Sequence, residues 1–497
     1  MSTLNLTLLT DLYELTMMQG YFKNHNQDVV VFDAFYRNNP CDGGYSVCAG
    51  LAQVIDYIEN LHFDADDINY LRSLKIFDED FLEYLSNFKF SGDIYAVPEG
   101  SLIFPREPLV KVVAPIMEAQ LIETAILNIV NHQCLIATKA ARVCYAAKGD
   151  NVMEFGLRRA QGPDSGTYGA RAAVIGGGHG ASNVPPWRGG CNGTSNVLAG
   201  QMFHVPVLGT HAHSWIMSFP DEYTAFRKYA ELYPSACILL VDTYDTLKSG
   251  IPNAIRVFTE MRDAGIPLTY YGIRMDSGDL AYLSKQVRKM LDEAGFPDAV
   301  ISASNDLDEY LIESLKLQGA AISSWGVGTN LITSKDNPAF GGVYKLAAIR
   351  TADGSFQPKI KLSENVEKVT NPGNKTFYRV YDKKTGKIKA DLICLYDETF
   401  DESEDLKLFD PNAPWKKTRL PGGSYTLREM LIPVIKAGKT IYTSPGVMEI
   451  REICNHEKDT IWDETKRFVN PQEIYVDLSQ KLYDMKTALL NEMSMDS

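Results

Sequence analysis

CILLVD, residues 237–242, is one of three short apolar runs that decide the fold class of this 497-residue chain. TYYGIRMD begins at Thr269 and AVISAS at Ala299, so the three runs start about 30 residues apart. That spacing is typical of one strand and one helix in a parallel sheet. The segments between the runs, such as DLAYLSKQVRKMLDEAG, have the periodicity of amphipathic helices. The sequence therefore predicts an α/β fold with an irregular β/α barrel over residues 151–345.

The chain on either side of this segment has a different character, and we expect three domains. Residues 1–150 join strand-like runs such as VVVFDAFYR to a long helical run, and predict an N-terminal α+β domain. The barrel domain, residues 151–345, also contains the runs NVMEFG, HVPVLG and ISSWGVG. Residues 346–497 are rich in polar turns and acidic stretches such as DETFDESEDLKLFD. They predict a smaller C-terminal region that packs on the N-terminal domain.

The composition excludes several classes of protein. With 45% apolar and 23% charged residues, the chain is typical of a soluble globular protein. The net charge of -14 argues against a nucleic-acid partner, because such binders need an excess of Lys and Arg. Asp11 and Glu14 lie where a signal peptide needs an apolar run, and no run is long enough to span a membrane. We expect no membrane partner, a cytoplasmic location and eight reduced cysteines without C-x-x-C pairs.

In the predicted barrel, reactive side chains gather where the strands end. Active sites of this fold lie at the C-terminal ends of the strands. The residues at these ends are Phe155, Arg158, Arg159, Thr210, His211, His213, Asp242, Arg274, Asp276, Asp279, Ser304, Asn305, Gly326, Gly328 and Thr329. Strand ends chosen only for solubility would not collect arginines, acids, a histidine and a glycine loop together. The pattern therefore predicts an active site.

The block IRMDSGDL suggests how this site binds anions. Arg274 and Asp276 are two residues apart on an extended segment, so their side chains point to one face. The arginine can grip a carboxylate or phosphate with two N–H groups, and the aspartate can hold Mg²⁺ or a ribose hydroxyl. The turn at Gly278 and the GVGT loop ending in Thr329 offer backbone amides to phosphate. A structural salt bridge is the alternative for the first pair, and a flexible loop is expected for IGGGHGASN, residues 175–183.

The stretch HVPVLGTHAHSW, residues 204–215, contains three of the eight histidines. His211-x-His213 at a strand end is similar to the first ligands of a metal-dependent amidohydrolase-like barrel. That fold needs further histidines on later strands, whereas only His456 follows, outside the barrel. A histidine beside arginines and acids is better placed to accept a phosphoryl group or a proton.

Seven blocks in order resemble one known family. They are TDLYELTMMQGYF, EFGLRRAQGPDSG, GTSNVLAG, GTHAHSW, LLVDTYDT, IRMDSGDL and GGVYKL. Together they closely resemble the nicotinate phosphoribosyltransferases of the type II phosphoribosyltransferase fold. The resemblance implies a ligase that joins nicotinate to 5-phosphoribosyl-1-diphosphate, coupled to ATP hydrolysis, as the first step of NAD salvage from nicotinate. It also implies Mg²⁺, an N-terminal domain that contributes to the active site, and a homodimer with shared active sites.

The resemblance also implies a role for individual residues. His213 matches the histidine that ATP phosphorylates, and Tyr13 and Phe155 match the aromatic residues on either side of the pyridine ring. Arg274 acts with His213 and Asp276 as the catalytic set, and Asp276 and Asp279 are the expected Mg²⁺ ligands. The further expected substrate contacts are Arg158, Arg159, Thr210, Ser214, Asp242, Gly278, Gly328 and Thr329.

Several alternatives stay open at the level of the sequence. A nicotinamide phosphoribosyltransferase shares the fold, the histidine and the DSGD block, and differs in the charge that the pocket offers. A quinolinate phosphoribosyltransferase gives no reason for His213. An inactive barrel would bind substrate without releasing diphosphate. The role of His211, the choice between Arg158 and Arg159, and the function of residues 346–497 are also open.

Overall fold

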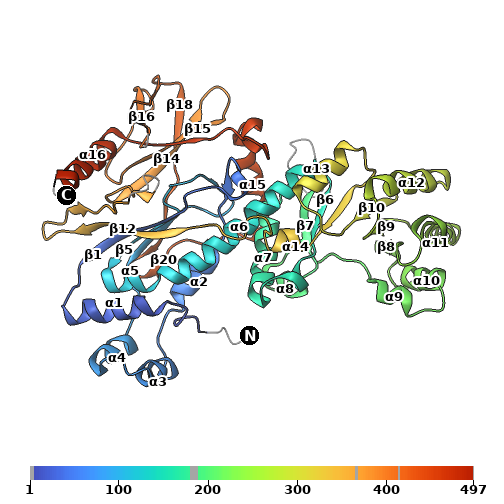
Figure 1. The fold of residues 1–497 in the computed structure, drawn as a ribbon, viewed down its shortest axis with the longest axis horizontal. Coiled ribbons are helices and arrows are strands. Elements are labelled where there is room, and N and C mark those ends of the chain that lie inside the picture. The colour runs from blue at the N-terminus through green and yellow to red at the C-terminus, as the bar shows by residue number, and fades with distance from the viewer. Residues whose placement is uncertain (1–4, 179–188, 364–367, 412, 414, 496–497) are drawn as a thin grey trace. The chain divides into compact units, whose positions relative to one another are not determined.

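The computed structural model describes residues 5–178, 189–363, 368–411, 413 and 415–495, which fold into two compact units (Figure 1). Unit 1 contains Met1–Leu135, Ala339–Pro445 and His456–Ser497. Unit 2 contains Ile136–Pro338 and Gly446–Asn455. Each unit has its own sheets, and we describe each by itself.

Unit 2 is built on a sheet of six strands in the order β7-β6-β11-β10-β9-β8. Every neighbouring pair in it runs parallel. The strands are β6 (Asn151–Glu154), β7 (Gly190–Thr194), β8 (Cys237–Leu240), β9 (Tyr271–Met275), β10 (Val300–Ala303) and β11 (Ser324–Val327). One parallel bridge joins Thr194, at the end of β7, to Val207. The unit is thus a mixed α/β fold with a parallel sheet.

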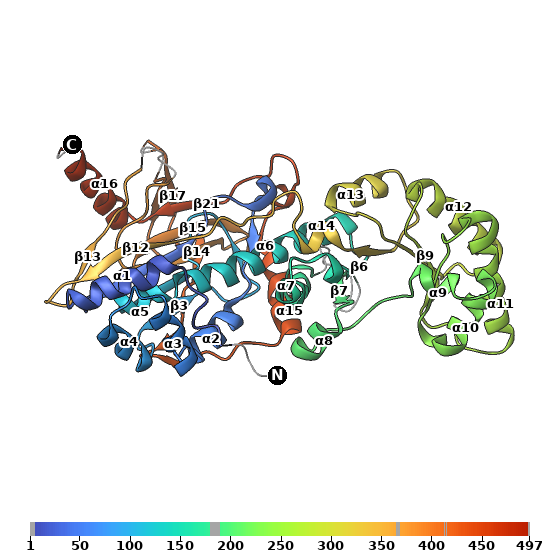
Figure 2. The ribbon, with the colours of Figure 1, turned by 60° about the horizontal axis from the view of Figure 1, so that its bottom comes forward.

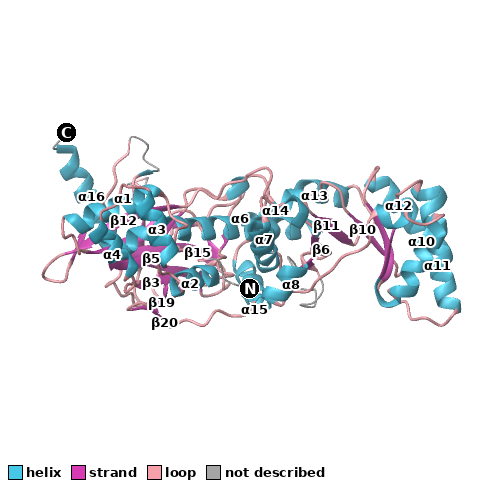
Figure 3. Cartoon of the chain, turned by 90° about the horizontal axis from the view of Figure 1, so that it is seen from below, coloured by secondary structure: helices cyan, strands magenta, loops and turns pink. Residues whose placement is uncertain are grey.

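Helices connect these strands and cover the sheet. The helices α7 and α8 lie beside β7 (Figure 2). The helix α10 contacts β8 (Figure 1), and α12 contacts β10 (Figure 3). The helices are the second part of α6 (Glu123–Ala147), α7 (Pro163–Gly176), α8 (Val197–Phe203), α9 (His213–Met217), α10 (Glu222–Leu232), α11 (Ile251–Asp263), α12 (Leu280–Glu293), α13 (Glu309–Leu317), α14 (Thr329–Ile332) and the first part of α15 (Val447–Thr460). Short helical turns cover Leu157–Arg159, Pro234–Ala236 and Thr246–Gly250.

The local sequence explains these elements. All four residues of β8 are buried, as expected for a strand of a parallel sheet covered on both faces. In α12 the buried residues include Leu280, Val287 and Leu291, which recur at helical spacing. The side chain of Asp279 accepts a hydrogen bond from the backbone N–H of Tyr282 and so caps the start of α12.

Unit 1 contains a seven-stranded sheet in which every neighbouring pair is antiparallel. In spatial order its strands are β13 (Phe356–Pro358), β12 (Val343–Arg350), β1 (Val29–Phe35), β5 (Val110–Pro115), β3 (Asp93–Ala96), β19 (Ile432–Lys436) and β20 (Lys439–Thr440). Strands from the start of the chain therefore pair with strands that follow residue 339. Phe32 of β1 stacks on Tyr344 of β12 with the ring centroids 4.7 Å apart, which places both segments in one core.

A second sheet of six strands completes unit 1. In spatial order its strands are β17 (Lys417–Leu420), β16 (Leu406–Phe409), β21 (Tyr475–Leu478), β15 (Ile388–Leu395), β14 (Lys375–Asp382) and β18 (Tyr425–Glu429). A short ladder joins β2 (Ser46–Val47) to β4 (Leu102–Ile103). The helices of this unit are α1 (Leu12–Lys23), α2 (Leu51–Glu59), α3 (Ala65–Ser73), α4 (Glu79–Ser86), α5 (Ile116–Leu121), the first part of α6, the end of α15 and α16 (Gln480–Met495).

Five of the six predicted apolar runs contain strands of the parallel sheet. The sixth, HVPVLG, forms only the single bridge at Val207. The residues on either side of that bridge, Pro206 and Leu208, are exposed, so this run is not a buried strand. No local pattern predicts β7, since GCNGT consists of small residues and contains only one apolar residue, Cys191. Residues 179–183 of the loop expected at 175–183 lie outside the described residues, and α7 continues to Gly176.

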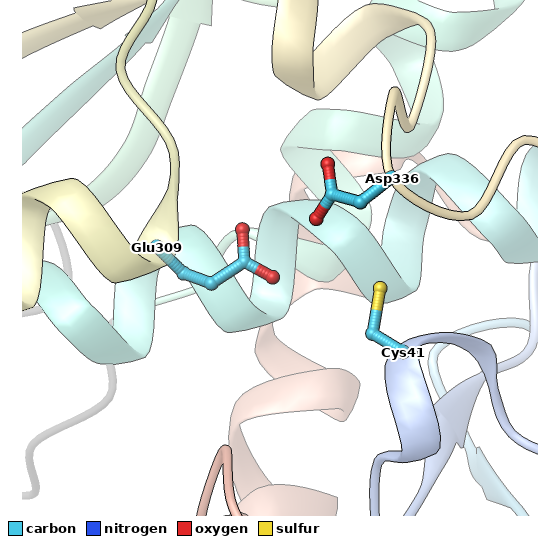
Figure 4. Close-up of side chains that lie close together, drawn as sticks. All are labelled: Cys41, Glu309 and Asp336. Atoms are coloured by element: carbon cyan, nitrogen blue, oxygen red, sulfur yellow. The ribbon is translucent and has the colours of Figure 1, made fainter.

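Charged side chains also hold parts of unit 2 together. The ammonium group of Lys139 on α6 lies 2.7 Å from Glu309 and 2.8 Å from Asp336, and both acids are drawn in Figure 4. Arg142, one helical turn further along, bonds to the other oxygen of Glu309 at 2.7 Å. This network ties α6 to the start of α13. No helix in the described part of the chain is long and apolar enough to cross a membrane.

Candidate active site

Arg274 lies at the centre of a polar cluster on the C-terminal edge of the unit 2 sheet. Its Nη1 donates to the hydroxyl oxygen of Thr210 at 2.7 Å, and its Nε donates to the hydroxyl oxygen of Ser304 at 2.9 Å. Arg274 lies in β9, Ser304 directly follows β10, and Thr210 lies in the loop before α9. Ser302 of β10 pairs with Arg274 of β9, so the two strands end side by side. The cluster therefore forms where the strand-end argument predicted it.

Asp276 joins the same cluster two residues after Arg274. Its Oδ1 lies 3.4 Å from Nη2 of Arg274 and accepts a hydrogen bond from the hydroxyl of Ser304. The Arg274 side chain is only 15% exposed, yet among the described residues its two shortest contacts are neutral hydroxyls and the one carboxylate contact, with Asp276, is 3.4 Å long. The guanidinium thus keeps much of its charge for an anionic ligand.

His213 and Asp242 form a second pair at this edge. Nε2 of His213, the first residue of α9, lies 3.2 Å from Oδ1 of Asp242, which follows β8. The side chain of Asp242 is 2% exposed, whereas that of His213 is 40% exposed. Oδ2 of Asp242 accepts from the backbone N–H of Asp276 and from the hydroxyl of Ser277, both at 2.7 Å. Asp242 therefore links His213 to the segment that carries Arg274.

Phe155, after β6, supplies the apolar surface of the site. Its ring centroid lies 5.8 Å from the guanidinium carbon of Arg274, within reach of a cation–π interaction. Gly326 makes room for this ring, because a Cβ there would lie 2.6 Å from a ring carbon of Phe155. At Gly328, also predicted at the site, an added Cβ would lie 3.2 Å from the backbone carbonyl oxygen of Phe155, a tight contact. A flat aromatic ligand can lie on such a surface.

His211 is buried beside the cluster and has a structural contact. Its Nε2 accepts a hydrogen bond from the backbone N–H of Leu240 at 3.3 Å, and its ring meets Tyr229 edge-on at 4.5 Å. Burial, together with the positive charge of Arg274, lowers the pKa of His211 to about 4. His211 is therefore neutral at pH 7, and the two histidines of the THAH segment differ: one is a buried acceptor, the other faces solvent.

Other predicted site residues lie on the same edge, and within the described part of the chain no hydrogen bond or ion pair joins their side chains to this cluster. Gly278 has φ 81°, the left-handed conformation that favours glycine in a turn. Asp279 is exposed and caps α12. Arg158 and Arg159 are exposed on the turn after Phe155, Ser214 is exposed on α9, and Thr329 begins α14.

Tyr13 belongs to unit 1, on α1, and its side chain is 45% exposed. Partial burial and the carboxylates of Glu123 and Glu14 raise the pKa of Tyr13, which keeps its hydroxyl neutral. Burial also raises the pKa of Glu14 to about 7. Thr124 donates to Oε1 of Glu14 from its N–H at 3.1 Å and from its hydroxyl at 2.8 Å. These contacts fix α1 and leave the ring of Tyr13 accessible.

The sequence analysis missed a group of cations near Tyr13. Glu123 accepts a hydrogen bond from Tyr13, and burial raises its pKa while the charge of Lys345 opposes the rise. Burial lowers the pKa of Lys345, and the charges of Lys361 and Arg37 add to this effect. Lys345 lies in the quoted block GGVYKL and Arg37 ends VVVFDAFYR. Alternation along these strands was the available signal, but Arg37 precedes Lys345 by 308 residues, and the pairing of β1 with β12 brings the ends of their segments together.

Models of three parts of one family match most of this chain. The model of the nicotinate phosphoribosyltransferase N-terminal domain matches residues 8–131. The nicotinate phosphoribosyltransferase family model matches residues 151–386, and the model of the C-terminal domain matches residues 374–486.

Full-length relatives and solved structures agree with these matches. The nicotinate phosphoribosyltransferase of Bacillus subtilis is 45% identical over 490 residues, covering 98% of this chain and 96% of the relative. The human nicotinate phosphoribosyltransferase is 30% identical over 97% of this chain and 96% of the relative. The crystal structure of human nicotinic acid phosphoribosyltransferase matches with a TM-score of 0.82 and 28% identity, over 97% of this chain and all of that one. The chain belongs to the nicotinate phosphoribosyltransferase family.

Proposed function

We propose that this protein transfers the phosphoribosyl group of 5-phosphoribosyl-1-diphosphate to nicotinate, giving nicotinate mononucleotide and diphosphate. ATP hydrolysis through a phosphorylated His213 is coupled to the transfer. The observation that carries the proposal is the single hydrogen-bonded chain from His213 through Asp242 and Asp276 to Arg274. It links a candidate phosphoryl acceptor to a candidate carboxylate receptor at one sheet edge. Family membership supports both roles.

The carboxylate of nicotinate binds to Arg274 and Thr210 in this proposal. The close partners of Arg274 are neutral hydroxyls, so its positive charge is not balanced by them. The hydroxyl of Thr210 lies 2.7 Å from Nη1. The pyridine ring lies on Phe155, and in the proposed homodimer the ring of Tyr13 from the other subunit covers its other face. A cation at this position favours the carboxylate of nicotinate over the neutral amide of nicotinamide.

The transfer step breaks the bond between C1 of ribose and diphosphate and forms a bond from C1 to the pyridine nitrogen. The developing positive charge at C1 and the departing polyanion must both be stabilised. Asp276 faces the ribose in this arrangement. The diphosphate meets the backbone N–H groups at Gly278, Gly328 and Thr329, and the side chains of Ser214 and of Arg158 or Arg159.

His213 is a suitable phosphoryl acceptor because Asp242 fixes its tautomer. The buried carboxylate of Asp242 accepts a hydrogen bond from Nε2–H of His213, so the proton stays on Nε2 and Nδ1 carries the free lone pair. Nδ1 attacks the γ-phosphorus of ATP, the bond to the β-γ bridging oxygen breaks, and ADP leaves. Hydrolysis of the N–P bond then returns free His213 and phosphate. The added charge at His213 acts on the Arg274 site through Asp242, which is a route for ATP to change substrate binding.

The acids at this edge fit Mg²⁺. Both contacts of Asp276 go to Oδ1, and the cap of α12 uses Oδ1 of Asp279, so in the described part of the chain Oδ2 of each remains available. Carboxylate oxygens on one side, with phosphate oxygens on the other, are the usual ligands of this ion. Mg²⁺ would neutralise the charge of the leaving diphosphate there.

The proposal extends to the assembly and the location of the protein. Six parallel strands and the bridge at Val207 support an irregular β/α barrel in unit 2. A homodimer with shared active sites would bring Tyr13 of one subunit to the Arg274 cluster of the other. The protein would work in the cytoplasm.

Diphosphate release tests the proposed reaction. Purified protein is mixed with Mg²⁺, phosphoribosyl diphosphate and either nicotinate or nicotinamide, with and without ATP. We expect diphosphate release with nicotinate at a rate at least 100-fold above that with nicotinamide, and an increase when ATP is added. Equal rates with both bases would contradict the carboxylate role of Arg274, and substrate binding without release would indicate an inactive scaffold.

A further inference from the structure

A buried carboxylate, that of Glu154, lies next to the aromatic surface of the proposed active site. Glu154 is the last residue of β6, directly precedes Phe155 and is fully buried. Its Oε1 accepts a hydrogen bond from the backbone N–H of Gly156, and its Oε2 accepts one from the hydroxyl of Thr194 at 2.6 Å. The proposed transfer reaction assigns no role to Glu154 or Thr194.

The contacts of Glu154 hold the backbone around Phe155. The N–H of Phe155 donates to the carbonyl oxygen of Val327 in β11 at 2.9 Å, and the next N–H, that of Gly156, donates to Glu154. A Cβ at position 156 would lie 2.7 Å from Oε1 of Glu154 and would also overlap the side chain of Ile332. Glycine at this position therefore permits the bond that fixes the backbone after the aromatic ring.

Thr194, at the end of β7, connects Glu154 to the segment that leads to Thr210. Thr194 is fully buried, and its N–H donates to the carbonyl oxygen of Pro206 at 3.1 Å. Its carbonyl oxygen accepts from the N–H of Leu208 at 2.9 Å. Two residues later in the chain, the hydroxyl of Thr210 accepts a hydrogen bond from Arg274. Thr194 therefore anchors the segment that carries a direct partner of this arginine.

Together these contacts form a closed circuit around the proposed nicotinate site. The circuit runs from Phe155 through Glu154 to Thr194 and continues along the chain to Thr210, which bonds to Arg274. The guanidinium carbon of Arg274 lies 5.8 Å from the centroid of the Phe155 ring, which closes the circuit. Such a circuit allows little change in the distance between the apolar surface and the cation. That distance decides whether one nicotinate molecule can contact both.

A carboxylate at position 154 has a property that an apolar side chain lacks. Burial raises the pKa of Glu154, whereas the hydrogen bonds from Thr194 and Gly156 oppose the rise. An apolar side chain of similar length would avoid the cost of burying a charge, but it could accept neither bond. The two oxygens of one carboxylate hold both donors at once. The chemistry of this position therefore fits the fixing of two neighbouring strand ends.

We propose that Glu154 is a positioning residue, which holds the ring of Phe155 at the distance from Arg274 that nicotinate requires. The inference rests on the proposed function, in which the pyridine ring lies on Phe155 and the carboxylate of nicotinate binds to Arg274. Glu154 acts through Phe155 and Thr194 and does not touch the substrate. Loss of its bond to Thr194 should therefore weaken the binding of nicotinate more than the binding of phosphoribosyl diphosphate.

Steady-state kinetics of the full-length protein test this role. Thr194→Val keeps the shape of the side chain and removes its hydroxyl, whereas Thr194→Ser keeps the hydroxyl and should rescue the bond. We expect Thr194→Val to raise the KM for nicotinate about ten-fold, since a hydrogen bond to a charged group is lost, and to change the KM for phosphoribosyl diphosphate less than about two-fold. Thr259→Val is the control, because it removes a hydroxyl that bonds to the backbone of Ile255 within α11.

Two results of these measurements would overturn the proposal. One is the same KM for nicotinate in Thr194→Val and Thr194→Ser. The other is a parallel rise of the KM values for both substrates in Thr194→Val, which would show that Thr194 supports the fold in general.

A second pair of variants covers the case in which Thr194→Val does not fold. Glu154→Met keeps the approximate length of the side chain and removes both acceptors. Glu154→Gln can accept from the N–H of Gly156 with its amide oxygen and donate to the hydroxyl oxygen of Thr194 with its NH₂ group. We expect a raised KM for nicotinate in Glu154→Met and a KM close to that of wild type in Glu154→Gln. Equal values in the two variants would contradict the positioning role.

Hydrogen–deuterium exchange of the substrate-free protein separates a failure of this inference from a failure of the proposed function. We expect residues 155–160 to exchange faster in Thr194→Val than in Thr194→Ser, with no difference in α11, which serves as the internal reference. Faster exchange supports the positioning of Phe155 whether or not the protein uses nicotinate. Unchanged exchange of residues 155–160 overturns it, even in a protein that transfers phosphoribosyl groups to nicotinate.

Discussion

Two arginines, one in each unit, show how differently the chain uses the same side chain. Arg379 in unit 1 is fully buried and meets three carboxylates, Asp391 at 2.7 Å, Glu457 at 3.1 Å and Glu107 at 3.7 Å. Arg274 in unit 2 is partly exposed and has two close hydroxyl partners and one distant carboxylate. The positive charge of Arg379 is balanced by carboxylates of the folded chain, whereas the positive charge of Arg274 remains available to a ligand. The partners of an arginine, more than its burial, separate the two uses.

The largest effect is expected from removing the structural arginine. Arg379→Met leaves a cluster of buried acids without its cation, which should lower the free energy of unfolding by about 3–5 kcal/mol. Urea denaturation followed by circular dichroism measures this change. Arg419→Ala, which breaks the exposed pair with Asp405, is the control and should cost less than about 1 kcal/mol. Equal losses for both variants would contradict the assignment of Arg379 to the fold.

The opposite pattern is expected for Arg274. Arg274→Ala should lower kcat/KM for nicotinate by about 100- to 1000-fold, since a charge-assisted contact of about 3–4 kcal/mol is lost. The midpoint of urea denaturation should stay close to that of wild type, because its neutral partners Thr210 and Ser304 can bond to water instead. Arg256→Ala, on the exposed face of α11, is the control. An unfolded Arg274→Ala variant would place this arginine in the same class as Arg379.

The hydrogen bond between His213 and Asp242 predicts that changes at either residue reduce the stimulation of the transfer by ATP. His213→Ala should abolish the stimulation by ATP and the acid-labile phosphate label, while some basal transfer remains. Asp242→Asn should reduce the stimulation at least ten-fold, because the neutral amide no longer holds the Nε2 proton of His213. His211→Ala should have a smaller effect on ATP stimulation, since that ring contacts the backbone of Leu240. Full stimulation in the His213 variant would rule out a phosphohistidine.

The two units should also respond to pH with opposite signs. Burial raises the pKa of Glu14 in unit 1 from 4.5 to about 7, so its stabilisation is complete below pH 4.5 and is lost as the pH rises through 7. Burial lowers the pKa of His211 in unit 2 from 6.5 to about 4, so its stabilisation is complete above pH 6.5 and is lost as the pH falls through 4.

Urea denaturation between pH 4 and 8 separates these contributions, each of which we expect to be of order 3 kcal/mol. Glu14→Gln should remove the decline of unfolding free energy with rising pH, and His211→Gln the decline with falling pH. Glu59→Gln and His62→Gln, at exposed positions, are the controls. A variant that leaves its pH slope unchanged would show that the corresponding group titrates normally.

The smallest expected effect is a partial recovery of activity when a variant in unit 1 is combined with a variant in unit 2. Tyr13→Ala and Arg274→Ala chains, each nearly inactive alone, are unfolded together and refolded in equal amounts. If a dimer shares its sites, random pairing makes about half of the dimers mixed, and one site in each mixed dimer is intact, so about a quarter of all sites should work. Differently tagged chains confirm that mixed dimers form. Mixed dimers without activity would mean that Tyr13 acts within its own subunit.

The parallel sheet and much of its edge could be predicted because each signal is local. The runs that contain β8, β9 and β10 are apolar and bounded by helices, so their ends, and with them Asp242 and Arg274, follow from periodicity. The strand β7 was not predicted because GCNGT has only one apolar residue, Cys191, and so no apolar run. Two partners of Arg379, Glu107 and Glu457, and the cation Arg37 near Tyr13 are far in sequence from the residues they meet, and tertiary packing brings them together. No single-sequence pattern specifies such contacts.

The pairing of β1 with β12 and of β3 with β19 has a consequence for synthesis on the ribosome. Residues 136–338 emerge as consecutive strand and helix units whose partners are close in sequence, and such local contacts form quickly. Within residues 1–135, β5 pairs with β1 and β3, but the outer neighbours of β1 and β3, which are β12 and β19, follow only after more than 200 further residues. Nascent unit 1 therefore exposes unpaired strand edges for most of translation, which is when chaperones are needed most. A message truncated after codon 338 would yield a chain whose first 135 residues cannot complete their sheet.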